Sequence, residues 1–293
     1  MVWIQEWLLT QGEMAQIFVF FSFLLLFLLL EMLWPRRTPS TPQRSRRVVN
    51  FTMTALNVAA LSFVPISFVG VAVWAEQSQL GLLHQVSLPI GWVLGLGLLA
   101  RGFISFGTHY LNHKVPWLWR IHRVHHLDTE LDVSSTVRMH PLEFFVNPLI
   151  GMPLVVVLGL SPWTLVLYEL LDAGITLFSH SNVRLPVKLD RVLKYIIVTP
   201  DLHRIHHSVK QPETDSNFSA VLPVWDMIFG TFRAYPEDGH EFMRLGLDQL
   251  REQERQGLLA LLLSPFRTFS IETPAMPDRP VTRGQKMLQE RAE

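Results

Sequence analysis

The sequence contains no cysteine, and only 17% of its 293 residues are charged. Without cysteine, the chain has no disulfide framework, no thiolate zinc site and no ligands of its own for an iron–sulfur cluster. Basic and acidic residues number 25 each, so the formal net charge is zero. A neutral chain lacks the basic surface that nucleic-acid phosphates require, which excludes nucleic acid as a partner. Any bound metal must therefore have nitrogen or oxygen ligands.

The sequence is rich in long apolar runs, although it is poor in charged residues. Hydrophobic residues make up 49% of the chain, and its mean hydropathy is positive. This composition is typical of membrane proteins rather than soluble domains. A bilayer-spanning helix needs about 20 apolar residues, and three stretches satisfy this requirement: 14–34, 54–74 and 88–108. A fourth apolar region, 144–178, is divided by Ser161–Pro162 and predicts a helical hairpin that enters and leaves on one side.

Basic residues predict the orientation of these segments. The loop 75–87 contains neither Lys nor Arg, whereas the loop between the first two spans contains Arg36, Arg37, Arg44, Arg46 and Arg47. Positively charged loops stay in the cytoplasm, so this first loop is predicted to be cytoplasmic. Counting spans from there places 109–143 and everything after residue 180 on the cytoplasmic side. We therefore expect a multi-pass membrane protein, of the inner membrane in a bacterium or the endoplasmic reticulum in a eukaryote.

The predicted organisation has five parts. Residues 1–108 hold transmembrane helices 1 to 3 with the basic loop, 109–143 form a first cytosolic histidine segment, and 144–178 form the membrane hairpin. Residues 179–272 form a second cytosolic histidine segment, and 273–293 are predicted to be a disordered tail. The expected fold is an all-α membrane protein with about four transmembrane helices plus a helical hairpin, capped by a cytosolic, histidine-rich helical metal domain.

Histidine is the most informative residue type, because ten of the twelve histidines fall in patterned positions. Residues three and four apart share one face of a helix, so HYLNH, HRVHH and HRIHH each present grouped imidazoles. Imidazole is a common ligand of iron, zinc and copper, and ten of them suit two ions with four to six sites each. The predicted ligands are His109, His113, His122, His125, His126, His140, His180, His203, His206 and His207. The remaining two, His84 and His240, are interpreted as incidental.

Several carboxylates accompany these histidines. Asp128, Asp132 and Asp201 lie near the clusters in sequence and are candidates to orient an imidazole N–H. Glu169 and Asp172 share one helical face inside the apolar hairpin, where carboxylates are energetically costly. Two interpretations of this pair stay open: pairing with Arg101 or Arg138 within the bundle, or support of the metal site.

The residues around the histidines resemble the fatty acid hydroxylase and sterol desaturase superfamily of integral-membrane oxygenases, in its bacterial-type members. The resemblance covers 101–232 and is carried by HYLNHKVPWLWRIHRVHH (109–126), RMHPLE (138–143), FSHSN (178–182), TPDLHRIHHSVKQPETDSNF (199–218) and WDMIFGTF (225–232). It implies a four-helix membrane bundle with a cytosolic metal domain, a centre of two iron ions held by the ten histidines, and O₂ as co-substrate. The sequence departs from the family pattern at Gly102, Phe106 and Tyr110, where many relatives carry an acidic residue, Tyr and Arg.

This pattern predicts an enzyme that hydroxylates or desaturates a C–H bond of a fatty acyl, sterol or related membrane lipid. Such a bond resists acid–base chemistry, so the reaction needs a redox metal and O₂. No catalytic residue is predicted beyond the metal centre, although purified protein could also hold zinc. Because the chain has no dinucleotide fingerprint, we expect a separate reductase or electron carrier as partner. The alternatives are a non-catalytic membrane metal-binding or zinc-transport protein, a bis-histidine haem protein and a metal-dependent lipid hydrolase.

Overall fold

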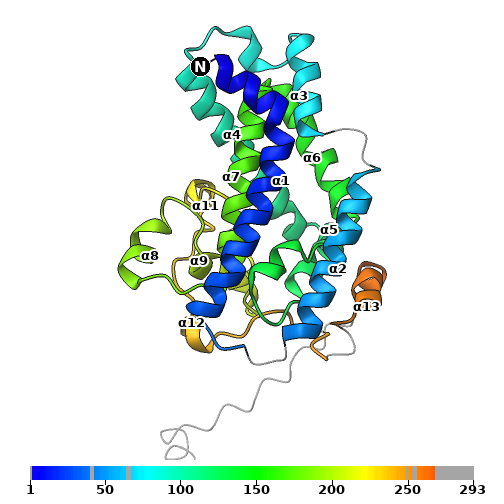
Figure 1. The fold of residues 1–293 in the computed structure, drawn as a ribbon, viewed down its shortest axis with the longest axis vertical. Helices are drawn as coiled ribbons and strands as arrows, with labels where there is room; N and C mark the ends of the chain where they lie inside the picture. The colour runs from blue at the N-terminus through cyan, green and yellow to red at the C-terminus, as the bar shows by residue number, and fades with distance from the viewer. Residues whose placement is uncertain (1, 40–42, 64–66, 249, 253–255, 268–293) are drawn as a thin grey trace, which may run out of the picture.

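The computed structural model describes residues 2–39, 43–63, 67–248, 250–252 and 256–267 (Figure 1). Across these residues the regular structure is helical, and extended segments pair only at two isolated bridges, Pro35 with Val183 and Ser208 with Leu245. The prediction of an all-α fold is therefore confirmed. The tail predicted for 273–293 lies outside the described residues.

The longer helices form a bundle that occupies the upper part of Figure 1 and runs down through its centre. Helix α7 contacts α1, α3 and α4, and α6 contacts α3 and α4. These helices pack through apolar side chains. For example, the ring centroids of Phe27 on α1 and Phe178 on α7 lie 5.6 Å apart. The helices of this bundle are α1 (Val2–Leu33), α3 (Phe68–Gln77), α4 (Ile90–Lys114), α6 (Glu143–Leu158) and α7 (Pro162–His180). Helix α2 (Gln43–Leu61) lies lower in the molecule, beside the short helices (Figure 1).

The shorter helices gather in the lower part of the molecule, around the ends of α4 and α7 (Figure 1). These short helices are α5 (Pro116–His126), η2 (Val133–Val137), α8 (Val187–Leu193), α9 (Pro200–His206), α10 (Gln211–Thr214), α11 (Val224–Phe229), α12 (Gly239–Phe242), α13 (Leu258–Leu263) and η4 (Ser264–Phe266). Two of them, η2 and η4, are 3₁₀ helices. Another 3₁₀ helix, η1 (Leu82–Gln85), lies in the connection between α3 and α4.

Among the residues that the structure describes, two helices, α1 and α4, are long and apolar enough to cross a bilayer. Helix α1 exposes large apolar side chains over several turns, among them Phe18, Phe21 and Leu25. Water-soluble proteins rarely expose apolar surface of this extent. The predicted span 54–74 differs from the structure, because α2 ends at Leu61 and α3 begins at Phe68. The sequence has a proline, Pro65, between these helices, and proline removes a helical hydrogen bond.

The predicted hairpin is present as α6 and α7. Gly159 follows α6 in the left-handed conformation with φ of +68°, and its amide donates to Val155 O. Glycine adopts this conformation without the steric penalty that other residues meet, so it suits the end of a helix. Pro162 then occupies the first turn of α7, where its missing amide hydrogen leaves no bond unmade. The turn thus sends α7 back toward the short helices.

The arginines of the first loop bind acidic residues of the two histidine segments. Arg46 Nη1 lies 2.7 Å from Asp128 Oδ2, and Arg47 Nε lies 2.9 Å from Asp132 Oδ2. Arg36 Nε lies 2.9 Å from Asp201 Oδ1, so the same loop reaches both segments. Asp128 is fully buried, and a buried charge needs a partner of opposite sign. The basic loop and both histidine segments therefore lie at the same end of the bundle.

Candidate metal centre

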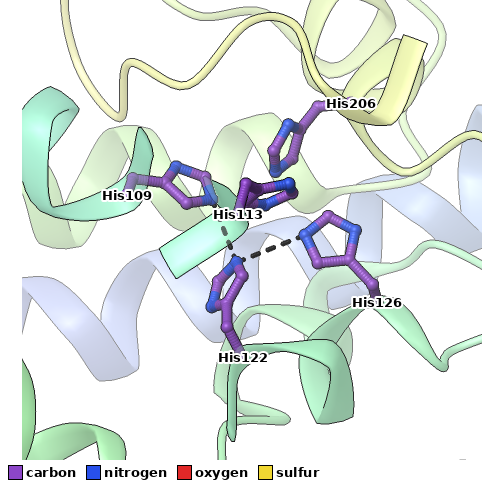
Figure 2. A group of neighbouring side chains, drawn as sticks. All are labelled: His109, His113, His122, His126 and His206. Atoms are coloured by element: carbon purple, nitrogen blue, oxygen red, sulfur yellow. Dashed lines mark hydrogen bonds between the residues drawn. The ribbon is translucent and has the colours of Figure 1, made fainter. Parts of the chain in front are cut away.

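Nine of the ten predicted ligands come together at this end of the bundle, in two groups. Within each group one ring nitrogen per histidine lies within 4.8 Å of those of all other members. The first histidine group, which converges on a common point in Figure 2, consists of His109, His113, His122, His126 and His206. The second histidine group consists of His125, His180, His203 and His207.

Helical spacing explains the composition of each group. His109 and His113 are four residues apart on α4, as are His122 and His126 on α5, and each pair enters the first group. His125, one residue before His126, points into the second group instead. Side chains four apart on a helix share a face, whereas consecutive side chains are separated by about 100° around the helix axis.

The histidines of α9 are also divided between the two groups, but here the pair four residues apart enters the second group. His203 lies within α9 and His207 directly follows it, and this pair, four residues apart, enters the second group. His206 enters the first group, and His180, the last residue of α7, completes the second. Each of the two helices α5 and α9 therefore supplies ligands to both groups, so the two sites share a common scaffold.

The distances between ring nitrogens suit bound metal ions. Nε2 of His122 lies 3.1 Å from that of His109 and 3.2 Å from that of His126. In the second group, Nε2 of His180 lies 3.1 Å from that of His125 and 3.0 Å from that of His203. Nitrogen ligands at about 2.1 Å from one ion lie roughly 3.0–3.4 Å from one another, so these spacings match a shared ion.

An unpartnered nitrogen supports the same conclusion. His206 Nε2 is buried and has no hydrogen-bond partner within the described part of the chain. Leaving such a group without a partner costs about 1–3 kcal/mol, which a metal ion at this position would offset. The first histidine group therefore fits a metal better than it fits a network of hydrogen bonds.

Backbone carbonyls orient three of the imidazoles. Nδ1 lies 2.7 Å from Phe218 O in His109, 2.8 Å from Thr176 O in His180 and 2.8 Å from Ser216 O in His206. Because a carbonyl only accepts hydrogen bonds, each Nδ1 must carry the proton and donate it. Nε2 then keeps its free lone pair, which is the form that binds a metal.

A carboxylate that the sequence interpretation overlooked orients a fourth imidazole. Glu143 is buried, and its Oε1 lies 2.9 Å from His122 Nδ1. A carboxylate in this place fixes the imidazole orientation and increases its basicity toward a metal. The motif RMHPLE contains Glu143, but 21 residues separate it from His122, so no local spacing indicated the contact. Asp215 Oδ1 lies 3.5 Å from His113 Nδ1 without a hydrogen bond between them.

The three aspartates that were candidates for this role bind other groups. Asp128 accepts from Arg46, Asn50 and Ser135, and Asp132 accepts from Ser134 and two arginines. Asp201 binds Arg36. The competition is electrostatic, because guanidinium groups carry a full charge and bind carboxylates more strongly than neutral imidazoles do.

Burial lowers the pKa values of several clustered imidazoles and so keeps these rings neutral. It lowers the pKa of His206 to about 3, and it holds the pKa values of His125, His126, His203 and His207 well below their usual range, with repulsion between neighbouring histidines adding to the effect. Only a neutral imidazole offers a lone pair to a metal. The groups are thus competent to bind cations at neutral pH.

His140 lies apart from both groups. Its Nε2 is 3.1 Å from Leu262 O, and its Nδ1 accepts from the amide of Leu142 at 3.1 Å. Both ring nitrogens therefore have backbone partners, and the structure does not bring this predicted ligand to the other nine. His84 and His240 also lie outside the two groups.

Glu169 and Asp172 lie on α7, and the two arginines considered as their partners have different surroundings. Arg138 donates to Asn50 Oδ1 and to Val124 O, so its contacts lie outside α7. Arg101 lies over the rings of Phe68 and Tyr168, 4.6 and 5.0 Å from their centroids. Of the two arginines, it is Arg101 that packs against α7.

A helical bundle thus ends in two histidine groups that could each hold a metal ion, and comparison with known proteins shows which family the chain resembles. Residues 94–231 match the model of the fatty acid hydroxylase family. These residues include all nine clustered histidines. This match confirms the resemblance predicted from the histidine motifs.

Three curated proteins illustrate the similarity. The chain is 30% identical over 178 residues to ornithine lipid hydroxylase OlsE of Rhizobium tropici, which covers 61% of this chain and 51% of that protein. It is 32% identical over 154 residues to a cholesterol 25-hydroxylase-like protein of Danio rerio, covering 49% and 57%. With human alkylglycerol monooxygenase the identity is 27% over 146 residues, covering 50% and 32%. The matched region thus spans about half or less of each relative's length, and no solved structure matches the chain.

Proposed function

We propose that this protein is a di-iron oxidoreductase that uses O₂ to hydroxylate or desaturate a C–H bond of a membrane lipid. The observation that carries the proposal is the convergence of nine imidazoles, seven of them from buried residues, into two adjacent groups. Each group would hold one ion. Iron bound there would supply the redox chemistry that an unactivated C–H bond requires.

The protein's own residues prepare the two sites. The carbonyls of Phe218, Thr176 and Ser216 hold protons on Nδ1, so that Nε2 faces the ion. Glu143 holds the ring of His122 in the same way. Such fixed ligands bind without reorganisation, and burial excludes the water that would compete for the metal. Zinc would bind the same nitrogens, so purified protein could hold zinc. We propose iron as the metal of the active enzyme.

The reaction also defines two partners. In hydroxylation one oxygen atom of O₂ enters the C–H bond and the other leaves as water, which consumes two electrons and two protons. The chain has neither a dinucleotide fingerprint nor cysteine ligands for a cluster, so we propose an external reductase or electron carrier. The lipid itself is the second partner.

The proposed location is a membrane, with four or so helical passes and the histidine groups on the cytoplasmic side. The apolar exterior of α1 and the length of α4 support insertion. The arginines of the first loop, which bind the histidine segments, support the orientation through the preference of basic loops for the cytoplasm. A bacterial inner membrane or the endoplasmic reticulum would satisfy both.

The relatives support a lipid as the substrate. Their names refer to ornithine lipid, cholesterol and alkylglycerol, which share an apolar body and lie in membranes. All three names describe a hydroxylase or monooxygenase, which favours hydroxylation over desaturation for this chain. We propose a fatty acyl, sterol or related membrane lipid as the substrate.

The test is lipid analysis of cells that express the wild-type protein or a His203→Ala, His207→Ala double variant, grown under ¹⁸O₂. We expect a lipid that carries one ¹⁸O atom, or an added double bond, only with the wild-type protein. His84→Gln, which lies outside both groups, is the matched control and should retain the product. A product that forms equally with the double variant, or without O₂, would contradict the proposal. Protein reconstituted with zinc in place of iron should bind the metal but yield no product.

A further inference from the structure

An apolar pocket of about 340 Å³ lies beside α4, between η1, the α6–α7 turn and α11. Its lining includes Leu96, Leu99 and Phe103, which form one stripe along α4, together with Leu160 from the α6–α7 turn and Trp225 from α11. Leu160 is fully buried, whereas Leu96 and Leu99 are 37% and 39% exposed. The pocket therefore has a closed floor and an open side, which faces the surroundings of a helix able to cross a bilayer.

Aromatic side chains connect this pocket to the first histidine group. Phe103 contacts Trp225 at 5.0 Å between ring centroids and Phe229 at 6.0 Å. Phe106, one turn further along α4, stacks on Phe229 at 5.3 Å and contacts Phe218 at 6.2 Å. Phe218 in turn lies 5.7 Å from the ring of His109. An unbroken apolar wall thus leads from the pocket to a predicted metal ligand.

The length of this wall matches a lipid chain. Leu99 and His109 are ten residues apart on α4, which corresponds to about 15 Å along the helix. The hydrocarbon core of a bilayer is about 30 Å thick, so one leaflet's chains extend over roughly 15 Å. A hydrocarbon chain that runs along α4 would therefore reach from the histidine groups to the pocket.

The indole of Trp225 lines the pocket from α11. Its Nε1 donates to Leu99 O at 3.1 Å, which satisfies the polar atom and holds the ring against α4. Gly102 favours this close approach, because a Cβ there would lie 3.3 Å from Trp225 Nε1 and the indole would have to shift by a few tenths of an ångström.

From these features we infer that the pocket binds the distal part of the substrate's hydrocarbon chain and so selects the chain length of the lipid that is oxidised. The inference rests on the proposed function for its substrate. Apolar contact is the only interaction that the lining residues offer, and it favours a methylene chain over a polar headgroup. Leu99 and Trp225 are then residues that determine specificity, and they lie outside the metal site.

The direct test is photolabelling of the iron-loaded full chain in phosphatidylcholine nanodiscs, with a phosphatidylcholine that carries a diazirine at the end of one acyl chain. We expect label on peptides that contain residues 96–103 and Trp225. Leu99→Trp fills the pocket, and displacement of even two methylene groups should lower this label on the order of tenfold. Leu149→Trp is the matched control, because Leu149 on α6 is 74% exposed and lies outside the pocket lining.

Lipid analysis of the same variants gives a second, independent measurement. Leu99→Trp should shift the oxidised products toward shorter chains, while its iron content and melting temperature stay at the wild-type level. Equal labelling of Leu99→Trp and the wild-type protein, or an unchanged product profile, would overturn the inference and leave the proposed function standing. If the pocket is labelled but no oxidised lipid forms, the pocket binds a hydrocarbon chain as inferred and the proposed function is refuted.

Discussion

His125 and His126 are consecutive residues of α5, yet their imidazoles belong to different histidine groups, with ring planes at 90° and centroids 5.4 Å apart. One turn of backbone thus supplies ligands to two sites. The structure therefore predicts that adjacent substitutions will affect different ions.

His125→Ala and His126→Ala should differ in metal retention. His125→Ala leaves three imidazoles in the second histidine group, whereas His126→Ala leaves four in the first histidine group. Four nitrogen ligands still suffice for a tetrahedral site, so His125→Ala should lose more metal. We expect its content after dialysis against a chelator to approach one ion per chain, with a smaller loss for His126→Ala. Elemental analysis measures this, with His84→Gln as control, and equal losses in both variants would contradict two separate sites.

Glu143→Ala should weaken metal binding although Glu143 is no ligand in either group. Its Oε1 is the partner of His122 Nδ1 at 2.9 Å, and loss of such a partner typically reduces metal affinity 10- to 100-fold. Competition with a chromogenic chelator measures the change. Glu237→Gln, which affects an exposed carboxylate bound to Lys210, should leave the affinity unchanged. If Glu143→Ala binds as tightly as the wild-type protein, the contact has no role in orienting His122.

The metal-free protein should lose stability as the pH falls below about 6.5. Unfolded histidines titrate near pH 6.5, whereas burial lowers the pKa of His206 to about 3. Between these values the unfolded state binds more protons, so the free energy of unfolding decreases as the pH falls, by about 1 kcal/mol per pH unit for each such histidine. Stability is thus fully present above pH 6.5 and is lost progressively toward pH 3.

Thermal melting of chelator-treated protein between pH 7.5 and pH 5.5 measures this dependence. The variant His206→Gln removes one titrating group, so its melting temperature should vary less with pH than that of the wild-type protein. A melting temperature independent of pH in the wild-type protein would mean that the imidazoles are not held neutral by burial.

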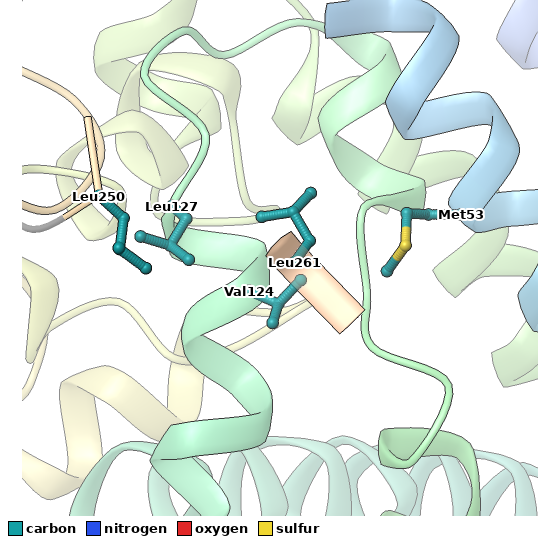
Figure 3. Packing of buried hydrophobic residues seen from close by; sticks show 5 residues of the cluster. All are labelled: Met53, Val124, Leu127, Leu250 and Leu261. Atoms are coloured by element: carbon teal, nitrogen blue, oxygen red, sulfur yellow. The ribbon is translucent and has the colours of Figure 1, made fainter. Parts of the chain in front are cut away.

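Leu261→Ala should destabilise the fold near the metal centre. Leu261 on α13 is fully buried in a cluster with Met53, Val124, Leu127 and Leu250 (Figure 3). Truncation of a buried leucine typically costs about 2–5 kcal/mol, because it leaves a cavity. Val124 lies on α5 between His122 and His125, so the cavity would also loosen the histidine helix.

The matched substitution is Leu259→Ala, on the same helix but 69% exposed. It should change the free energy of unfolding by no more than about 0.5 kcal/mol. Melting in detergent compares the two, and iron retention should follow stability. Similar effects of both substitutions would indicate that α13 does not pack against α5 as described.

The sequence alone determined which residues could bind metal and where the helices could turn. Two HxxHH motifs and HYLNH place imidazoles together on helices of any tertiary arrangement, because helical periodicity depends only on the local backbone. The Gly159 to Pro162 turn is equally local, since glycine and proline restrict or permit backbone conformations by themselves. The hairpin and the pairing of histidines four residues apart were therefore predictable. The expectation that each HxxHH motif presents its three imidazoles together was wrong, because one histidine of each motif enters the other group.

Tertiary structure decided how those ligands are divided and supported. The separation of His125 from His126, and of His206 from His207, depends on how α5 and α9 are rotated against α4 and α7. The pairing of Glu143 with His122, and the engagement of Asp128 by Arg46, join segments far apart in the chain. His140 looked like a ligand by its motif, but the packing of α13 gives its Nε2 a carbonyl partner. No local pattern encodes such contacts, because they arise from the relative orientation of helices that only the packed core establishes.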